Sequence, residues 1–200
     1  MFTGIIQALG RITAIEPAGG DQRVHIATGS LDMRAVRFGD SIAVSGVCLT
    51  VAELGGDGFW ADVSAETLSC TTFAQMQVNA VVNLECALTP TTALGGHLVS
   101  GHVDGVGCVA ERRDDARSVR LLITAPTTLS RYIAAKGSIC IDGVSLTVNA
   151  VNAADFELNI VPHTLRATTL GEYSVGRRIN LEVDIIARYL ERLLESHATK

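Results

Sequence analysis

Apolar and polar residues alternate in short runs along most of the chain, which is the period of a β-strand. The runs at 23–26, 41–45 and 59–64 show this alternation, and turn-forming residues separate them. Short alternating runs between turns are typical of antiparallel barrels and sandwiches. The pattern therefore predicts an all-β protein.

The sequence contains an internal repeat, in which the second copy follows the first at a constant offset of 97 positions. Segment 41–51 aligns with 138–148 without a gap, and Asn83-Leu84-Glu85 aligns with Asn180-Leu181-Glu182. A constant offset indicates two copies of one fold. We therefore predict one domain at 1–97, a second at 98–183 and a separate C-terminal segment at 184–200.

The period changes in this last segment. Five large apolar residues follow spacings of three and four, which predicts an amphipathic helix with Asp184 as its N-cap: Ile186, Tyr189, Leu190, Leu193 and Leu194. Their burial would contribute on the order of 10 kcal/mol. Either the two barrels of the same chain cover this face, or the helix packs against its copies in other subunits.

Composition excludes several classes of protein. Apolar residues make up 48% and charged residues 18% of the chain, as in a well-packed globule. The net charge of −5 argues against a nucleic-acid surface. There is no apolar run long enough to span a membrane and no basic start typical of a signal peptide, so we expect a cytoplasmic protein. The five cysteines lack the spacing of a disulfide framework or a zinc site.

Positions at which the copies differ are informative, because the scaffold is shared. Several polar or reactive residues face a different residue in the other copy: Cys48 faces Ser145, Ser45 faces Asp142, Ile5 faces His102, Asp62 faces Asn159, Ser64 faces Val161, and Glu66 faces His163. This divergence indicates two pockets with different tasks, or ordinary drift between repeats.

Five segments of the sequence, taken in order, allow a more specific interpretation. They read MFTGII at 1–6, GVCLTV at 46–51, GGHLVSGHVDG at 95–105, DGVSLTV at 142–148 and PHTL at 162–165. Together with Lys136 and the start of the last helix, they closely resemble riboflavin synthase of the alpha-chain type. The resemblance covers essentially the whole chain, including the duplication.

The resemblance implies two six-stranded antiparallel Greek-key barrels followed by the C-terminal helix. It implies a homotrimer held by a bundle of those helices, with each active site between the N-terminal barrel of one subunit and the C-terminal barrel of another. The implied reaction converts two molecules of 6,7-dimethyl-8-ribityllumazine into riboflavin and 5-amino-6-ribitylaminouracil, without a metal or redox cofactor. The sequence leaves open whether the trimer sits inside a lumazine synthase shell.

The resemblance also implies two sets of substrate-binding residues, with Lys136 reaching across from a neighbouring subunit. The first set combines the opening of the chain with the C-terminal barrel: Gly4, Ile5, Ile6, Ser145, Leu146, Thr147, Asn159, Ile160, Val161, Pro162, His163 and Thr164. The second combines the N-terminal barrel with the opening of the second copy: Cys48, Leu49, Thr50, Asp62, Val63, Ser64, Ala65, Glu66, Thr67, Gly101, His102 and Val103.

Four of these positions are catalytic candidates. His102 is a candidate for proton transfer or for ribityl binding, since the ordinary pKa of histidine suits neutral pH. Cys48 would add to an electron-poor lumazine carbon or hydrogen-bond to it, and Ser145 would orient a water or hydroxyl. Asp184 would orient Ser145 or a histidine, or would only cap the helix. For His97 we expect a structural role.

Two other functions fit parts of the sequence. A non-catalytic lumazine or flavin binder, such as the antenna-type lumazine proteins, would keep the duplicated fold. The presence of Cys48, His102, Ser145 and Lys136 favours the enzyme instead. A flavin-dependent reductase module would need a Gly-x-Gly-x-x-Gly segment for a nicotinamide, and the sequence has none at the right spacing.

Overall fold

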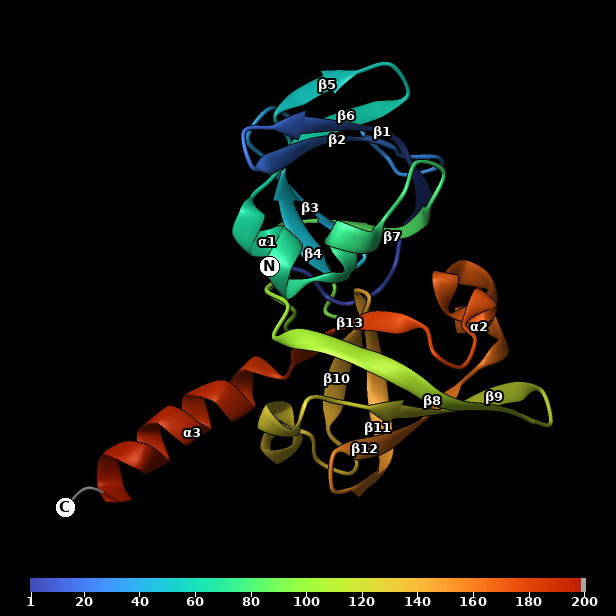
Figure 1. The fold of residues 1–200 in the computed structure, drawn as a ribbon, viewed down its shortest axis with the longest axis vertical. Coiled ribbons are helices and arrows are strands. Elements are labelled where there is room, and N and C mark those ends of the chain that lie inside the picture. The colour runs from blue at the N-terminus through green and yellow to red at the C-terminus, as the bar shows by residue number, and fades with distance from the viewer. Residues whose placement is uncertain (199–200) are drawn as a thin grey trace.

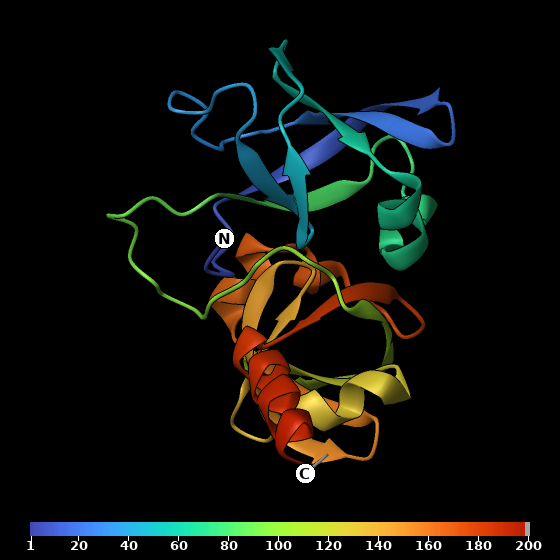
Figure 2. The same cartoon turned by 90° about the vertical axis from the view of Figure 1, so that its left-hand side faces the viewer.

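The computed structural model describes residues 1–198, so the last two residues of the predicted 184–200 segment lie outside the described residues. Two β-domains are stacked on one another, and a long helix, α3 (Ile185–Ala198), projects from the second (Figure 1). Figure 2 shows the chain between the domains as a loop at one side of the molecule. The all-β prediction and the C-terminal helix are confirmed.

The C-terminal domain is a closed antiparallel barrel with the strand order β10-β11-β12-β9-β8-β13. Its alternating residues place one apolar face inside, where Leu121, Ile123 and Phe156 are fully buried. The sequence alternation thus becomes a single filled core. The strands are β8 (Gly105–Asp115), β9 (Ser118–Thr124), β10 (Ser138–Ile141), β11 (Val144–Asn152), β12 (Asp155–Ile160) and β13 (Arg178–Val183).

The N-terminal domain has the equivalent sheet with one strand divided, in the order β4-β3-β7-β1-β2-β6-β5. β11 shifts register between Val148 and Ala150, and at the equivalent place in the first copy the strand is interrupted, which gives β4 and β5. This sheet therefore forms an open half-barrel. Its strands are β1 (Ala8–Ala18), β2 (Asp21–Ala27), β3 (Ser41–Val44), β4 (Val47–Thr50), β5 (Glu53–Gly55), β6 (Gly58–Val63) and β7 (Val81–Cys86).

Short helices follow the same repeat. Thr71 and Thr168 each separate an α-helical turn from a 3-10 turn, and each side chain accepts a backbone hydrogen bond from the residue two positions ahead. The same local sequence therefore folds the same way twice. These elements are α1 (Ala65–Cys70), η1 (Thr72–Gln75), α2 (Pro162–Ala167) and η3 (Thr169–Glu172), with η2 (Thr127–Tyr132) in the second copy alone.

A pseudo-two-fold axis relates the two domains. Phe2 pairs with its own repeat partner, Val99, through two backbone hydrogen bonds of 2.7 and 3.1 Å. The side-chain amide of Asn83 donates to the carbonyl of Asp142, and that of Asn180 donates to the carbonyl of Ser45, both at 2.8 Å. These buried reciprocal bonds dock the copies in one orientation. No helix among the described residues is long and apolar enough to cross a membrane.

Candidate active site

The opening segment of the chain lies against the C-terminal barrel. The N–H of Ser145 on β11 donates to the carbonyl of Gly4 at 2.7 Å. A Cβ on Gly4 would lie 2.6 Å from the Cβ of Ser145, and Gly4 has a φ of +76°, so this position requires glycine. Ile5 is then 48% exposed, while Ile6 packs on the C-terminal core. We call this place the C-terminal site.

The opening of the second copy lies against the N-terminal domain in the same way. The N–H of Cys48 on β4 donates to the carbonyl of Gly101 at 2.8 Å, and a Cβ on Gly101 would lie 2.7 Å from the Cβ of Cys48. His102 is exposed beside it, and Val103 packs against the N-terminal core. This is the N-terminal site. Each domain is therefore completed by the opening segment of the other.

Two buried glutamates hold these opening segments. Glu85 on β7 accepts hydrogen bonds from the N–H of Thr3 at 2.7 Å, from its hydroxyl at 2.6 Å and from the N–H of Gly4 at 2.9 Å. Glu182 on β13 accepts the same three bonds from Ser100 and Gly101, at 2.6, 2.6 and 2.9 Å. Burial raises the pKa of both carboxyls, and the hydrogen bonds oppose that rise.

Sequence reasoning did not select these glutamates as site residues, although the repeated Asn-Leu-Glu contained the signal. A glutamate retained in both copies on an otherwise apolar strand needs buried partners. The structure shows those partners to be the backbone that forms the two sites.

The remaining predicted residues lie where a strand meets a short helix. Asp62 and Val63 end β6, with Ser64 to Thr67 leading into α1, and Asn159 to Thr164 make the same passage from β12 into α2. Ser64 caps α1 by accepting from the N–H of Thr67 at 3.2 Å. The side-chain oxygen of Asn159 is buried and has no hydrogen-bond partner. An unpaired buried oxygen is uncommon in a folded protein.

His97 is brought to the C-terminal site, although we expected it to be structural. Its Nδ1 lies 2.7 Å from the hydroxyl oxygen of Ser145, and its backbone N–H donates to the carbonyl of Thr3. The side chain is 8% exposed and its Nε2 is buried with no hydrogen-bond partner. Burial lowers the pKa of His97, and the charge of Asp184 opposes this decrease. A mainly neutral imidazole can exchange a proton with Ser145.

Asp184 performs one of its predicted tasks, the capping of the last helix, while neither His97 nor Ser145 has a side-chain hydrogen bond to it among the described residues. Its Oδ1 accepts a hydrogen bond from the N–H of Ile186 at 3.0 Å, so it caps α3. Its charge also acts on His97. Lys136 is different, because the structure of one chain shows no ion pair for its side chain among the described residues. Its φ of 67° is in the left-handed region, where the repeat partner is Gly39.

The sequence is similar to known proteins of one family. The sequence matches the lumazine binding domain twice, over residues 3–87 and 100–184. A riboflavin synthase of Photobacterium phosphoreum is 50% identical over 194 residues, which is 97% of this chain and 89% of the relative. The riboflavin synthases of Brucella abortus and Bacillus subtilis are 42% and 36% identical, covering 98% and 97% of this chain and 98% and 90% of their own lengths.

The chain belongs to the riboflavin synthase family. Solved structures of LumP also resemble it: LumP complexed with riboflavin has a TM-score of 0.85 at 28% identity, over 92% of this chain and 99% of that one. LumP complexed with 6,7-dimethyl-8-(1'-D-ribityl) lumazine has a TM-score of 0.82 at 27% identity, with the same coverage. The full-length synthase relatives support an enzyme of the transferase class over a protein that only binds.

The two family matches leave 88–99 between them, and this linker carries His97. The domain model therefore covers the two barrels, while the full-length synthase relatives span the linker as well. The described residues contain no group of three histidine, cysteine, aspartate or glutamate side chains placed to hold a metal ion.

Proposed function

We propose that this protein acts on two molecules of 6,7-dimethyl-8-ribityllumazine and moves a four-carbon unit from one to the other, giving riboflavin and 5-amino-6-ribitylaminouracil. One observation carries the proposal beyond family membership. The exchange of opening segments builds the same backbone frame around Cys48 and around Ser145. Binding two molecules of one substrate requires two similar sites. Because one molecule donates the four-carbon unit and the other accepts it, the reactive side chains of the two sites are expected to differ.

At the C-terminal site we assign proton transfer to Ser145 and His97. The hydroxyl of Ser145 is oriented by the imidazole 2.7 Å away, and burial keeps that ring neutral until it accepts a proton. Asp184 would stabilise the imidazolium that forms, as a carboxylate does beside a catalytic histidine. The unpaired oxygen of Asn159 would accept a donor from the lumazine or its ribityl chain.

At the N-terminal site we assign contact with the second lumazine to Cys48 and His102. Cys48 is partly buried beneath Gly101, and His102 stands exposed at the rim of the site. His102 is suited to take a proton from the exocyclic methyl group, which the extended ring acidifies. The thiol of Cys48 lies where the ring carbon or its hydrogen-bonding edge would be held.

Joining two rings requires them face to face, and orientation alone can supply several kcal/mol of the barrier. We propose that the N-terminal site of one subunit meets the C-terminal site of another in a homotrimer, as the resemblance to riboflavin synthase implies. The exposed apolar side chains of α3, between 55% and 67% accessible, are the proposed contact: Ile186, Tyr189, Leu190, Leu193 and Leu194. Lys136 would then reach across from a neighbouring subunit.

Residence in the cytoplasm and association with a lumazine synthase shell stay predictions from the sequence.

The test is anaerobic incubation of the purified protein with 6,7-dimethyl-8-ribityllumazine alone. We expect one mole of riboflavin for every two moles of lumazine consumed, with no added cofactor. The control is a Ser145→Ala protein, which should bind lumazine but release riboflavin far more slowly. Tight binding without riboflavin formation by the unmodified protein would contradict the proposal and leave the binding role seen in the LumP complexes.

A further inference from the structure

Each opening segment contains a side-chain hydroxyl that links a glutamate to the residue facing the site. Thr3 and Ser100 occupy this place in the two copies. The hydroxyl of Ser100 donates to Glu182 at 2.6 Å and accepts a hydrogen bond from the backbone N–H of His102 at 3.3 Å. A hydroxyl has one proton to donate and lone pairs that accept, so the two bonds use both capacities of this group.

The first copy makes the same pair of bonds around a different residue. The hydroxyl of Thr3 donates to Glu85 at 2.6 Å and accepts from the N–H of Ile5 at 3.1 Å. Ile5 has no group that can take up a proton, whereas the imidazole of His102 has one. The arrangement therefore belongs to the shared scaffold, but only in the second copy does it hold the backbone of a residue with a titratable side chain.

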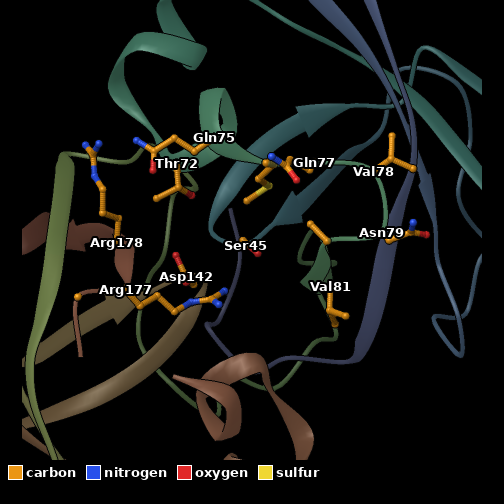
Figure 3. Close-up of a pocket in the computed structure, with 13 residues that line it drawn as sticks. Ser45, Thr72, Gln75, Gln77, Val78, Asn79, Val81, Asp142, Arg177 and Arg178 are labelled. Atoms are coloured by element: carbon orange, nitrogen blue, oxygen red, sulfur yellow. The ribbon is translucent and has the colours of Figure 1, made fainter. Parts of the chain in front are cut away.

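The strand beneath Ser100 is fixed at the contact between the domains. Glu182 lies on β13 two residues after Asn180, whose N–H donates to Asp142 at 2.7 Å and whose carbonyl accepts from the N–H of Asp142 at 3.0 Å. The side-chain amide of Asn180 donates to the carbonyl of Ser45 at 2.8 Å. Asp142 and Ser45 line the groove between the domains that Figure 3 shows. The carboxylate that holds Ser100 therefore has a rigid support on both sides of the domain contact.

His102 depends on its backbone for its position. Its side chain is exposed, and the hydrogen bonds of the described residues include none from its imidazole. The preceding Gly101 has a φ of +79°, and its carbonyl accepts from the N–H of Cys48 at 2.8 Å. Without the hydroxyl of Ser100, the N–H of His102 would lose its partner, and the chain after this flexible glycine would be held less firmly.

We propose that Ser100 is a positioning residue for the reaction, because its hydroxyl holds the backbone of His102 and so places the imidazole at the rim of the N-terminal site. This inference rests on the proposed function, in which His102 takes a proton from the exocyclic methyl group. Proton transfer requires the base within hydrogen-bond reach of the proton, so a small displacement of the ring lowers the rate. Ser100 acts through His102 and not on the substrate itself.

A double-mutant cycle in riboflavin formation tests the proposal. We expect Ser100→Ala to lower kcat about 10-fold with little change in KM, and Ser100→Thr, which installs the residue of the first copy, to restore most of the rate. In a His102→Gln background, Ser100→Ala should lower kcat no further, because there is no imidazole left to displace. The matched control is Ser118→Ala, which removes a serine hydroxyl that donates to the carbonyl of Asp115 in the turn between β8 and β9. This control should keep the rate of its background in both cases.

Hydrogen–deuterium exchange at the His102 amide measures the hydrogen bond without the reaction. We expect faster exchange in Ser100→Ala than in the unmodified protein and in Ser100→Thr. Circular dichroism establishes that the variants are folded, and Ser100→Cys, whose thiol is a weak donor and acceptor, takes the place of Ser100→Ala if that variant does not fold.

Equal losses of kcat in both backgrounds, an unchanged kcat in Ser100→Ala, or unchanged exchange at His102 would each overturn the role of Ser100. Absence of riboflavin from the unmodified protein would instead contradict the proposed function. The exchange measurement would in that case still decide whether the hydroxyl of Ser100 holds the backbone of His102.

Discussion

His97 has two ring nitrogens in different surroundings. Nδ1 faces the hydroxyl of Ser145, whereas Nε2 is buried without a partner. Leaving a buried polar atom unpaired costs about 1–3 kcal/mol, which a purely structural histidine would not need to incur. At the scale of the residue, this asymmetry favours a ring that gains or loses a proton during the reaction.

Replacing His97 by glutamine should lower kcat about 100-fold while KM changes much less, because the variant keeps polarity but loses the titrating ring. Steady-state riboflavin formation across a pH series measures this, and the acidic limb of the kcat profile should change with it. His25→Gln is the matched control, since His25 lies on β2 and hydrogen-bonds Thr13. A similar loss in both variants would refute the role of His97.

Lys136 adopts a backbone conformation that glycine holds in the first copy, with φ of 67° at Lys136 and 87° at Gly39. We therefore expect Lys136→Gly to raise the free energy of unfolding by about 1 kcal/mol, because the left-handed conformation is costly for a residue with a Cβ. If Lys136 also reaches a neighbouring site, turnover falls while stability rises. Chemical denaturation and kinetics on one preparation measure both, and Ala134→Gly is the control for added backbone freedom.

Residue identities were only partly predictable. The repeat selected Cys48 and Ser145, because it provided two versions of one position to compare. His97 has no partner at the offset of 97, so this comparison could not find it. Its contact with Ser145 depends on the course of the linker, which no local pattern encodes.

At the scale of the element, the exchanged opening segments are the main feature that periodicity did not predict. Segments 2–4 and 99–101 are too short to show an alternation, and their positions are set by single hydrogen-bonding groups of distant strands. The barrel strands were predictable, since burial of one face imposes period two. The interruption between β4 and β5 was not predictable from the sequence. The second copy accommodates a shift of register at the equivalent place within the continuous strand β11, whereas the first copy breaks the strand there.

The glutamates that hold the opening segments give an element-scale prediction. Glu85→Gln directs an amide N–H₂ group at groups that are themselves donors, so we expect a loss of about 1–3 kcal/mol in the free energy of unfolding and impaired lumazine binding at the C-terminal site. Glu182→Gln should impair the N-terminal site instead. Denaturant unfolding and lumazine titration measure these effects.

Glu16→Gln, at an exposed position on β1, is the control for loss of one negative charge. If both glutamate variants affected the same site, the assignment of one opening segment to each site would be wrong.

At the scale of the whole molecule, α3 is held at a fixed angle and still exposes its apolar face. The hydroxyl of Tyr132 on η2 donates to Glu191, and Arg188 pairs with Asp104 and lies over the Tyr132 ring. A helix anchored along one side presents its other side for contact. Exposed apolar faces of this kind are typical of interaction surfaces, which supports the proposed contact between subunits.

Introducing a charge on this face should disassemble the proposed trimer. We expect Ile186→Asp with Tyr189→Asp to be monomeric by light scattering coupled to size exclusion, and to lose most riboflavin formation while each barrel still binds lumazine. Arg192→Gln, on the same helix, should remain trimeric. A monomeric unmodified protein with full activity would refute assembly through α3.

The two copies differ at the contact between the domains, where the second copy has the ionisable Asp142 and the first copy has Ser45. Burial raises the pKa of Asp142 from 3.8 to about 6. The folded state therefore holds this proton more tightly than the unfolded chain, so the stabilisation is complete below about pH 4 and is lost as the pH rises through 6. At about 1.4 kcal/mol for each pKa unit, the loss is about 3 kcal/mol.

Asp142→Asn removes this titration while keeping the shape and the left-handed backbone, which asparagine tolerates. Between pH 4 and pH 7, the free energy of unfolding of the unmodified protein should fall relative to the variant by about 2 kcal/mol. Glu85, Glu182 and His97 titrate in both proteins, so their contributions cancel in the difference. A constant difference across this range would mean that Asp142 is ionised in the folded protein throughout, with Tyr173 and Asn180 fully compensating its burial.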